Sequence, residues 1–173
     1  KEISNKLSED VLEMEKMLNE YLQFTSNQYS EKNEMFDISE LVLNTTKKYE
    51  NNNIIIETEP KIIFNGRKNL IIRCLNNFID NSIKYSKKII IALKKGKNNL
   101  TIIIDDDGPG IPLEEYTNVF KPFYKINKSR GDSKSSVGLG MSIASDIVQS
   151  HGGNIILEKS HLNGLRVKIF LPF

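Results

Sequence analysis

The sequence of 173 residues predicts an α+β domain, an antiparallel or mixed β-sheet covered by helices on one face, preceded by a long helix. Three observations predict this fold. Apolar residues recur at helical spacing in residues 1–25, 68–86 and 138–150. Short runs rich in isoleucine lie between these helical segments. The last four runs form two pairs joined by short turns, which favours antiparallel neighbours over a regularly alternating parallel fold.

The first 25 residues are predicted to form one helix, and the sequence leaves its packing partner open. No Gly or Pro interrupts it, and an apolar stripe advances in steps of three and four residues. The stripe consists of Ile3, Leu7, Val11, Met14, Leu18 and Tyr21, widened by Leu12, Met17 and Leu22. It packs either on its own domain or in a bundle with other helices from a second chain. Residues 25–34 are polar and are predicted to be a linker.

The next part of the chain is predicted to alternate between strands and helices. Asp37 followed by Glu40 resembles a capping box at the start of a helix. Two β-branched or aromatic runs flank Pro60 and are predicted to pair with each other. The expected elements are a strand at 35–38, a helix from Asp37 to about Tyr49, strands at 54–56 and 62–64, and a helix at 68–86.

The second half of the chain is predicted to contain two hairpins and one helix. Residues 96–99 and the Asn163-Gly164 pair supply the hairpin turns, and Gly152-Gly153 ends the helix. The expected elements are strands at 89–95 and 100–105, a Gly/Pro segment at 107–112, an aromatic cluster at 119–124, a mobile polar segment at 127–136, a helix at 138–150, and strands at 154–159 and 165–171.

Composition excludes several classes of function. The net charge is only +2, which is not typical of a protein that coats nucleic acid. Cys74 is the only cysteine, so an intrachain disulfide and a cysteine-rich zinc site are excluded. No apolar run in the sequence approaches the length that spans a bilayer, and no signal peptide is visible. Because the chain starts at Lys1, we expect it to be a fragment of a longer protein.

One group of polar residues on the helix at 68–86 is a candidate for binding a metal and a phosphate. Asn77 and Asn81 share one helix face, and Lys84 and Tyr85 continue it. Amide oxygens are hard ligands that suit Mg²⁺, and a lysine suits phosphate oxygens. The same residues also fit a solvated polar stripe.

Two glycine-containing segments are further candidates. Gly108 and Gly110 allow close approach of a ligand, and the carboxylate of Asp106 accepts a hydrogen bond from an exocyclic amine such as that of adenine. An ordinary acidic turn after a strand is the alternative. Gly138 and Gly140 precede a helix N-terminus, whose free N–H groups suit phosphate. A plain entry into a helix is the alternative there.

Aromatic and basic residues lie between these two glycine segments. Phe120 and Phe123 surround Pro122, either as core residues or as the hinge of the mobile segment. The basic residues are either part of a solvated loop or of a lid that closes on polyphosphate. They are Lys125, Lys128, Arg130 and Lys134.

The order and spacing of these segments resemble the catalytic ATP-binding domain of sensor histidine kinases. The matching strings are Asn77-Phe-Ile-Asp-Asn81-Ser-Ile-Lys84-Tyr85-Ser86, Asp106-Asp-Gly-Pro-Gly110-Ile-Pro112, Phe120-Lys-Pro-Phe123-Tyr, Gly138-Leu-Gly-Met-Ser-Ile143 and His151-Gly-Gly153. They follow the order of the family's N, G1, F and G2 boxes, over roughly residues 35 to 173. The resemblance implies a two-layer α/β sandwich of the GHKL type, a mixed sheet under three helices that binds ATP and Mg²⁺.

The resemblance also implies a role for each matching residue. Asn81 is the expected Mg²⁺ ligand, with Asn77 as a second candidate, and Asp106 recognises the adenine amino group. Asn77, Lys84 and Arg130 are the expected catalytic residues. The residues expected to bind the nucleotide are Asn77, Asn81, Lys84, Tyr85, Asp106, Gly108, Gly110, Ile111, Phe120, Phe123, Lys125, Arg130, Gly138, Leu139, Gly140 and Met141.

The resemblance divides the chain into two parts. Residues 1–34 resemble the second helix of the dimerisation and phosphoacceptor hairpin plus a linker, and residues 35–173 the catalytic domain. The helix with the phosphoacceptor histidine is missing, and His151 and His161 do not stand in that context. The implied activity is transfer of the ATP γ-phosphoryl group to a histidine outside this chain, then to an aspartate of a response regulator. The implied setting is a homodimer formed through the leading helix, cytoplasmic, attached to the membrane only through other parts of the parent, and without nucleic acid.

Two departures from the family pattern and three other functions bear on this interpretation. Ser136 replaces the first glycine of the G2 string, and Asp107 stands where the family often has Asn. The related ATP hydrolases carry Glu at the position of Asn77, and an amide cannot act as their general base. An anti-sigma-type Ser/Thr protein kinase uses the same pocket but does not explain the leading helix. A degenerate nucleotide-binding or dimerisation module is the third alternative.

Overall fold

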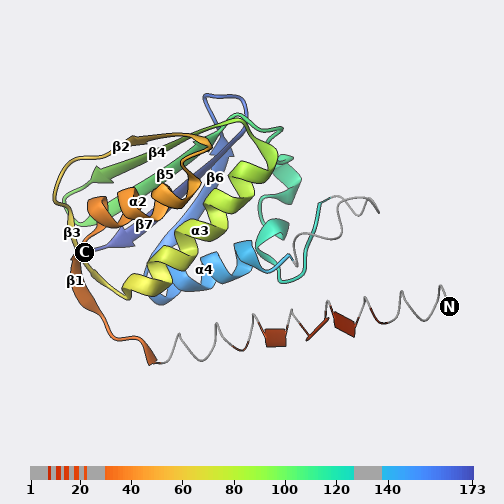
Figure 1. The fold of residues 1–173 in the computed structure, drawn as a ribbon, viewed down its shortest axis with the longest axis horizontal. Helices are drawn as coiled ribbons and strands as arrows, with labels where there is room; N and C mark the ends of the chain where they lie inside the picture. The colour runs from red at the N-terminus through yellow and green to blue at the C-terminus, as the bar shows by residue number, and fades with distance from the viewer. Residues whose placement is uncertain are drawn as a thin grey trace.

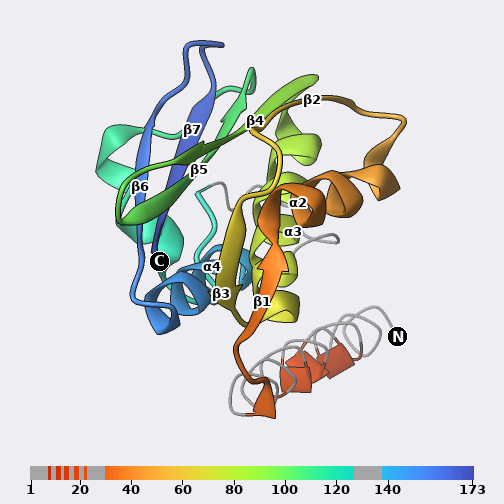
Figure 2. The same ribbon diagram turned by 90° about the vertical axis from the view of Figure 1, so that its left-hand side faces the viewer.

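The computed structural model describes residues 30–126 and 138–173, together with Ser8, Val11, Leu12, Met14, Glu15, Leu18, Asn19 and Leu22 of the leading segment. Two layers form the body of the molecule, a mixed sheet of five strands and a layer of helices on one of its faces (Figures 1 and 2). This confirms the predicted fold class.

The elements follow one another as the sequence patterns require. Hydrogen-bonded order across the large sheet is β2-β4-β5-β7-β6, and β1 and β3 form a separate two-stranded sheet. The described elements are β1 (Glu34–Asp37), α2 (Ile38–Thr46), β2 (Asn53–Glu57), β3 (Ile63–Gly66), α3 (Lys68–Tyr85), β4 (Lys88–Lys95), β5 (Asn99–Asp106), α4 (Gly140–Ser150), β6 (Asn154–Lys159) and β7 (Leu165–Pro172), with short 3₁₀ turns at Lys47–Tyr49, Leu113–Glu115 and Asn118–Phe120.

The core forms where the alternating sheet face meets the helices. In β5, Leu100, Ile102 and Ile104 point toward the helices and are almost completely buried. On α3, apolar residues at helical spacing, such as Leu75 and Ile79, complete this layer. This packing fixes the ends of β5, α3 and α4 relative to one another.

Local signals predicted most elements correctly. Asp37 caps α2, because its Oδ1 accepts the Ser39 N–H at 2.9 Å and the Glu40 N–H at 3.3 Å. The hairpins β4–β5 and β6–β7 are antiparallel as predicted. The predicted end of the helix at Gly152-Gly153 is also confirmed, since Gly152 has φ of 74° after α4.

The predicted pairing of residues 54–56 with 62–64 is wrong. Strand β2 instead runs parallel to β4, with Ile55 opposite Ile90, and β3 is antiparallel to β1, with Phe36 opposite Phe64. The chain between β2 and β3 does not form a hairpin, and the Ile38 N–H bonds the Ile62 carbonyl at 2.9 Å. Phe64 packs against Phe36, and this burial selects β1 as the partner of β3. The two residues are far apart in the sequence, so the local residue pattern could not predict the contact.

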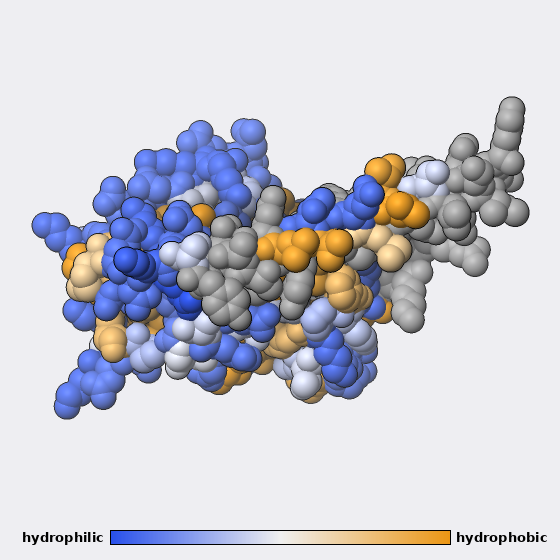
Figure 3. Space-filling view, turned by 90° about the horizontal axis from the view of Figure 1, so that it is seen from below, coloured by the Kyte–Doolittle hydropathy of each residue, from blue (hydrophilic) through white to orange (hydrophobic). Residues whose placement is uncertain are grey.

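The described residues of the leading segment are helical, and their apolar side chains are exposed. Figure 3 shows hydrophobic side chains of this segment at the molecular surface. Between about half and two thirds of each is exposed: Val11, Leu12, Met14, Leu18 and Leu22. Among the described residues, no helix is long and apolar enough to cross a membrane.

Candidate functional site

Helix α3 carries the asparagines that the sequence singled out, and it faces the start of α4. The Asn77 side chain lies against Gly140, where an added Cβ would be 3.4 Å from Asn77 Oδ1. The Nδ2 atom of Asn77 is buried and has no hydrogen-bond partner within the described structure. A buried amide without a partner costs free energy, so this atom marks a place suited to a ligand.

The remaining α3 residues of the predicted site lie farther toward the end of the helix. Asn81 is half-buried, whereas Lys84 and Tyr85 are exposed in the last turn. Lys84 Nζ lies 5.0 Å from the centre of the Tyr85 ring. The helix therefore presents two amides and a cation in a row, from the partly buried Asn77 outward.

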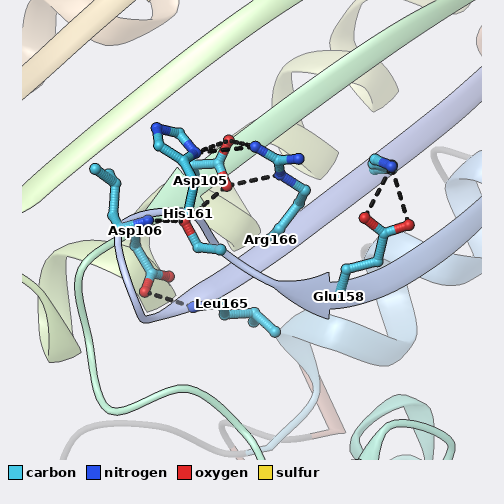
Figure 4. A network of polar contacts seen from close by, with 9 residues as sticks. Asp105, Asp106, Glu158, His161, Leu165 and Arg166 are labelled. Atoms are coloured by element: carbon cyan, nitrogen blue, oxygen red, sulfur yellow. Dashed lines mark hydrogen bonds and ion pairs between the residues drawn. The ribbon is translucent and has the colours of Figure 1, made fainter.

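Asp106 lies at the end of β5 with its carboxylate held by three protein donors. Oδ1 accepts the Gly108 N–H at 2.9 Å and the Leu165 N–H at 3.0 Å, as Figure 4 shows for Leu165. Oδ2 accepts the Ser82 hydroxyl at 3.2 Å. A carboxylate offers about four acceptor positions, so Oδ2 keeps one for a further donor. Asp106 was predicted from its sequence motif, whereas the roles of Ser82 and Leu165 were not.

The turn after Asp106 holds its shape through backbone contacts. Gly110 has φ of 72°, in the left-handed region that glycine favours. Ile111 is partly buried against the core. Asp107, in contrast, is exposed and accepts the Lys87 and Lys88 N–H groups at 2.8 and 2.9 Å. These backbone hydrogen bonds, from Lys88 first, hold the pKa of Asp107 below its usual value, so its charge ties the turn to β4.

Helix α4 begins beside Asn77 without a side-chain cap from the described residues. Its N-cap is Leu139, whose side chain is buried in the core. Gly138 has φ of 78°, and its carbonyl accepts the Phe123 N–H at 2.9 Å. The first N–H groups of α4 are therefore available to an anion, as at other helix N-termini that bind phosphate. Met141 packs partly against the core in the first turn.

The aromatic pair predicted beside this helix divides between two environments. Phe120 is partly buried against the core, whereas Phe123 is 56% exposed and has φ of 64°. Lys125 is half-buried. Arg130, Ser136 and the predicted mobile segment lie outside the described residues.

The structure thus brings most of the predicted residues to one end of the sheet. Asp106 accepts a hydrogen bond from Ser82 of α3, and the start of α4 lies against Asn77 of the same helix. Lys84 and Tyr85 lie in the last turn of α3. Gly164, which the sequence analysis used only as a turn signal, packs directly on Asp106. The described residues contain no cluster of three His, Cys, Asp or Glu side chains that could hold a metal ion.

Comparison with known proteins assigns this arrangement to a family. The model of the family described as "Histidine kinase-, DNA gyrase B-, and HSP90-like ATPase" matches residues 66–173. The chain therefore belongs to this family of ATP-binding domains. Sensor histidine kinase CpxA of Escherichia coli K12 is 37% identical over 108 residues, which are 62% of this chain and 24% of CpxA. Sensor protein PhoQ of the same organism is 30% identical over 118 residues, 68% of this chain and 24% of PhoQ.

Solved structures show the same fold. The catalytic domain of histidine kinase ThkA matches with a TM-score of 0.73 at 24% identity, covering 82% of this chain and 95% of that domain. Full-length ShkA, solved in complex with AMPPNP, matches with a TM-score of 0.75 at 18% identity, covering 96% of this chain and 36% of ShkA. The chain spans about a quarter of the length of the curated relatives it matches.

Proposed function

We propose that this chain is the ATP-binding catalytic part of a sensor histidine kinase. In this proposal residues 35–173 bind Mg·ATP, and residues 1–34 are the second helix of a dimerisation and phosphoacceptor hairpin with its linker. The family assignment supports the first part, and the exposed apolar side chains of the leading helix support the second. The observation that carries the proposal is the carboxylate of Asp106, fixed by three donors with one acceptor position left.

Asp106 supplies recognition of the base. Asp106 is 6% exposed, and its carboxylate oxygens accept hydrogen bonds from three donors of the chain. The ligand group that fits its remaining position is a donor, such as the 6-amino group of adenine. Guanine carries a carbonyl at that position, which would face the carboxylate with no proton between them. The site therefore favours ATP over GTP.

The start of α4 and the amides of α3 fit a magnesium triphosphate. The uncapped N–H groups after Gly138 suit phosphate oxygens, and the buried Asn77 Nδ2 suits an acceptor oxygen. Asn81 would hold Mg²⁺ through its amide oxygen, with Lys84, Lys125 and Arg130 as cations for the phosphates. When bound, Mg²⁺ would neutralise the negative charge that develops on the transferred phosphoryl group.

Phosphoryl transfer fits these residues better than hydrolysis. An asparagine occupies position 77, and an amide cannot accept a proton from an attacking water. Both histidine rings contact other groups of the chain, and the ring of His161 is 55% exposed. His151 Nε2 accepts the Arg67 N–H at 3.0 Å while its Nδ1 lies 2.7 Å from the Ile147 carbonyl, and His161 Nδ1 lies 2.9 Å from Arg166 Nη2. The phosphoacceptor in this proposal is therefore a histidine outside this chain.

Calorimetric titration with ATP, with and without Mg²⁺ and with GTP as the control, tests the pocket. We expect ATP binding that Mg²⁺ strengthens and weak or no GTP binding. Asp106→Asn should abolish the preference for ATP, and Asn81→Asp should change the Mg²⁺ titration. A folded sample that binds neither nucleotide would contradict the proposal.

The parent protein tests the remaining steps. In it, we expect the γ-phosphoryl group of ATP to appear on a histidine and then on an aspartate of a response regulator. A homodimer joined by the leading helix should be visible in sedimentation at high concentration. The proposed location is the cytoplasm, with membrane attachment through other parts of the parent.

A further inference from the structure

Two adjacent aspartates hold the same turn from opposite faces of the sheet. Asp106 contacts it on the helix side, where Oδ1 accepts the Leu165 N–H and the main-chain carbonyl accepts the Gly164 N–H at 3.2 Å. Asp105 contacts it on the uncovered side, where Oδ1 accepts the Ser160 hydroxyl at 2.7 Å. Consecutive side chains of a strand point to opposite faces, so one turn between β6 and β7 receives both contacts.

Arg166 clamps the Asp105 carboxylate in a two-point ion pair (Figure 4). Arg166 Nε lies 2.8 Å from Oδ1 and Nη2 lies 2.9 Å from Oδ2, and the two residues are directly opposite in the β5–β7 ladder. Asp105 is only 4% exposed. Its burial alone would raise its pKa, but the hydrogen bonds from Arg166 and Ser160 outweigh burial and lower it.

The turn fits against Asp106 with no free space. A Cβ atom added at Gly164 would overlap Asp106 Oδ1 and the Asp106 carbonyl oxygen, and would lie 2.5 Å from Gly108 N. The turn is also closed internally, since the Ser160 N–H bonds the Gly164 carbonyl at 2.9 Å. A shift of the turn therefore moves the N–H of Leu165, which is one of the donors that orient Asp106.

We propose that Arg166, acting through Asp105 and Ser160, is a positioning residue that sets the specificity of Asp106 for the adenine amino group. Arg166 lies on the sheet face opposite the helices and does not reach the nucleotide. It fixes the turn, and the turn fixes the orientation of the carboxylate. This inference rests on the proposed binding of ATP by Asp106.

The mechanism predicts a specific defect. Discrimination by a single hydrogen bond to a carboxylate depends on placing the acceptor within a few tenths of an ångström. Without Arg166, Asp105 loses the two-point ion pair that fixes its carboxylate, and the Ser160 hydroxyl of the turn then bonds a carboxylate that is free to rotate. The proposed contacts to the triphosphate are made at the start of α4, and the turn between β6 and β7 takes no part in them. The amino-group preference should fall while affinity for the rest of the nucleotide is kept.

The test compares ATP with purine riboside 5′-triphosphate, which lacks the 6-amino group, by calorimetry in the presence of Mg²⁺. We expect the wild-type chain to bind ATP about 10-fold more tightly or better, as for a hydrogen bond to a charged acceptor. In Arg166→Met this ratio should fall to about 3 or less, with purine riboside triphosphate affinity changed by less than about 3-fold. Arg166→Lys should restore part of the ratio.

Lys168→Met is the matched control. Lys168 follows on the same face of β7, but its Nζ pairs with Glu158 at 2.8 Å and not with Asp105. Loss of this neighbouring cation should leave the ratio unchanged.

The outcomes separate this inference from the function on which it rests. A wild-type chain that binds both nucleotides equally would contradict the adenine assignment itself. If the wild type discriminates and Arg166→Met keeps the ratio, or loses both affinities equally, the positioning role is wrong. If Arg166→Met does not fold, Ser160→Ala decides, because it removes the hydroxyl that bonds Asp105 and that accepts the Leu162 N–H. A lower ratio in that variant supports the role, and an unchanged ratio overturns it.

Discussion

The N-termini of α3 and α4 lie close to the same core, but within the described part of the chain a protein anion occupies only that of α3. At the start of α3, the Glu31 carboxylate accepts the Asn69 N–H at 2.7 Å and the Leu70 N–H at 3.2 Å. At the start of α4, no described side chain takes this place. The first N–H groups of each helix have no partner within the helix, and each N-terminus is the positive end of the helix dipole, so both ends favour an anion.

The two helix ends separate a contribution to stability from a contribution to binding. The α3 end is satisfied from within the chain, by a residue next to the leading helix. The α4 end is open beside Asn77, whose buried Nδ2 also has no partner within the described structure. In our proposal, the anion that completes α4 is the triphosphate. The consequence is that changes at the α4 end should affect binding, and changes at the α3 end should affect stability.

The largest effect is expected from Gly138→Ala, which alters the entry to α4. At φ of 78°, an added Cβ would lie 3.0 Å from Phe123 C and from Tyr124 O, so the backbone must shift. ATP affinity should fall by about 30-fold or more, since several N–H contacts are lost together. Gly152→Ala, at the other end of α4, is the control. Gly152 also has a positive φ, of 74°, but the atom nearest to a Cβ added there is 3.4 Å away. Equal ATP affinities in a calorimetric titration would refute the role of the α4 end.

A smaller loss of binding, with no loss of stability, is expected from Asn77→Leu. Removing a buried amide without a partner should stabilise the nucleotide-free chain by about 1 kcal/mol, while Mg·ATP affinity falls by about 10-fold or more. Thermal unfolding with and without Mg·ATP measures both effects. Asn76→Leu is the control and should keep binding, since Asn76 lies 3.3 Å from the Tyr49 hydroxyl, whose proton Asp80 accepts at 2.5 Å. A destabilised Asn77→Leu chain would show that Nδ2 already has a partner.

At the other helix end, Glu31→Ala should lower the free energy of unfolding by about 1 kcal/mol and leave ATP affinity unchanged. The reason is the loss of two hydrogen bonds and of a favourable charge at the α3 N-terminus. Urea unfolding measures the stability. Glu34→Ala removes an exposed acidic side chain three residues away and should have no such effect. Equal stability of the two variants would remove Glu31 as the cap of α3.

The smallest effect is a pH dependence that comes from His151, which joins the two helices. Burial lowers the pKa of His151 most, and the charge of Arg67 lowers it further. The Ile147 carbonyl and Glu31 raise this pKa, but by less, so it stays below its usual value. The pKa of His151 is lower in the folded chain than in the unfolded chain. Its contribution to the free energy of unfolding is therefore fully present above the unfolded-state pKa of about 6.5, and it is lost as the pH falls through the folded-state pKa. The loss should stay below about 1 kcal/mol, since solvent screens a half-buried ring.

Urea unfolding at neutral and mildly acidic pH measures this dependence. The stability of His151→Gln should change less over that range than the stability of the wild type. The comparison variant is His161→Gln, which removes the ring beside Asp105 in the β6–β7 turn and leaves the contacts of His151 in place. A wild-type pH dependence in His151→Gln would assign the effect to other groups.

Local patterns predicted the helices, the two hairpins and the cap at Asp37, because each depends on residues within a few positions. The partners of β2 and β3 were predicted wrongly, since both pair with strands outside their own neighbourhood. The residues of the site also fall into those that a local motif predicts and those that it does not. Asp106 and Asn77 stand in short recognisable strings, whereas Ser82 and Leu165 reach Asp106 from separate elements. The Asn163-Gly164 signal predicted a turn but gave no indication that Gly164 packs on Asp106.

The element types, the sheet-and-helix class and the family resemblance can all be derived from the sequence, because periodicity, capping residues and motif spacing are local properties of the chain. The polar groups that are satisfied, and those that are left for a ligand, become apparent once the elements pack together. Glu31 reaches α3 across 38 positions and Arg166 reaches Asp105 across 61. Such contacts depend on how the elements pack, and burial then makes each unpaired polar atom costly. For that reason the open end of α4 and the orphaned amide of Asn77 are visible only in the folded chain.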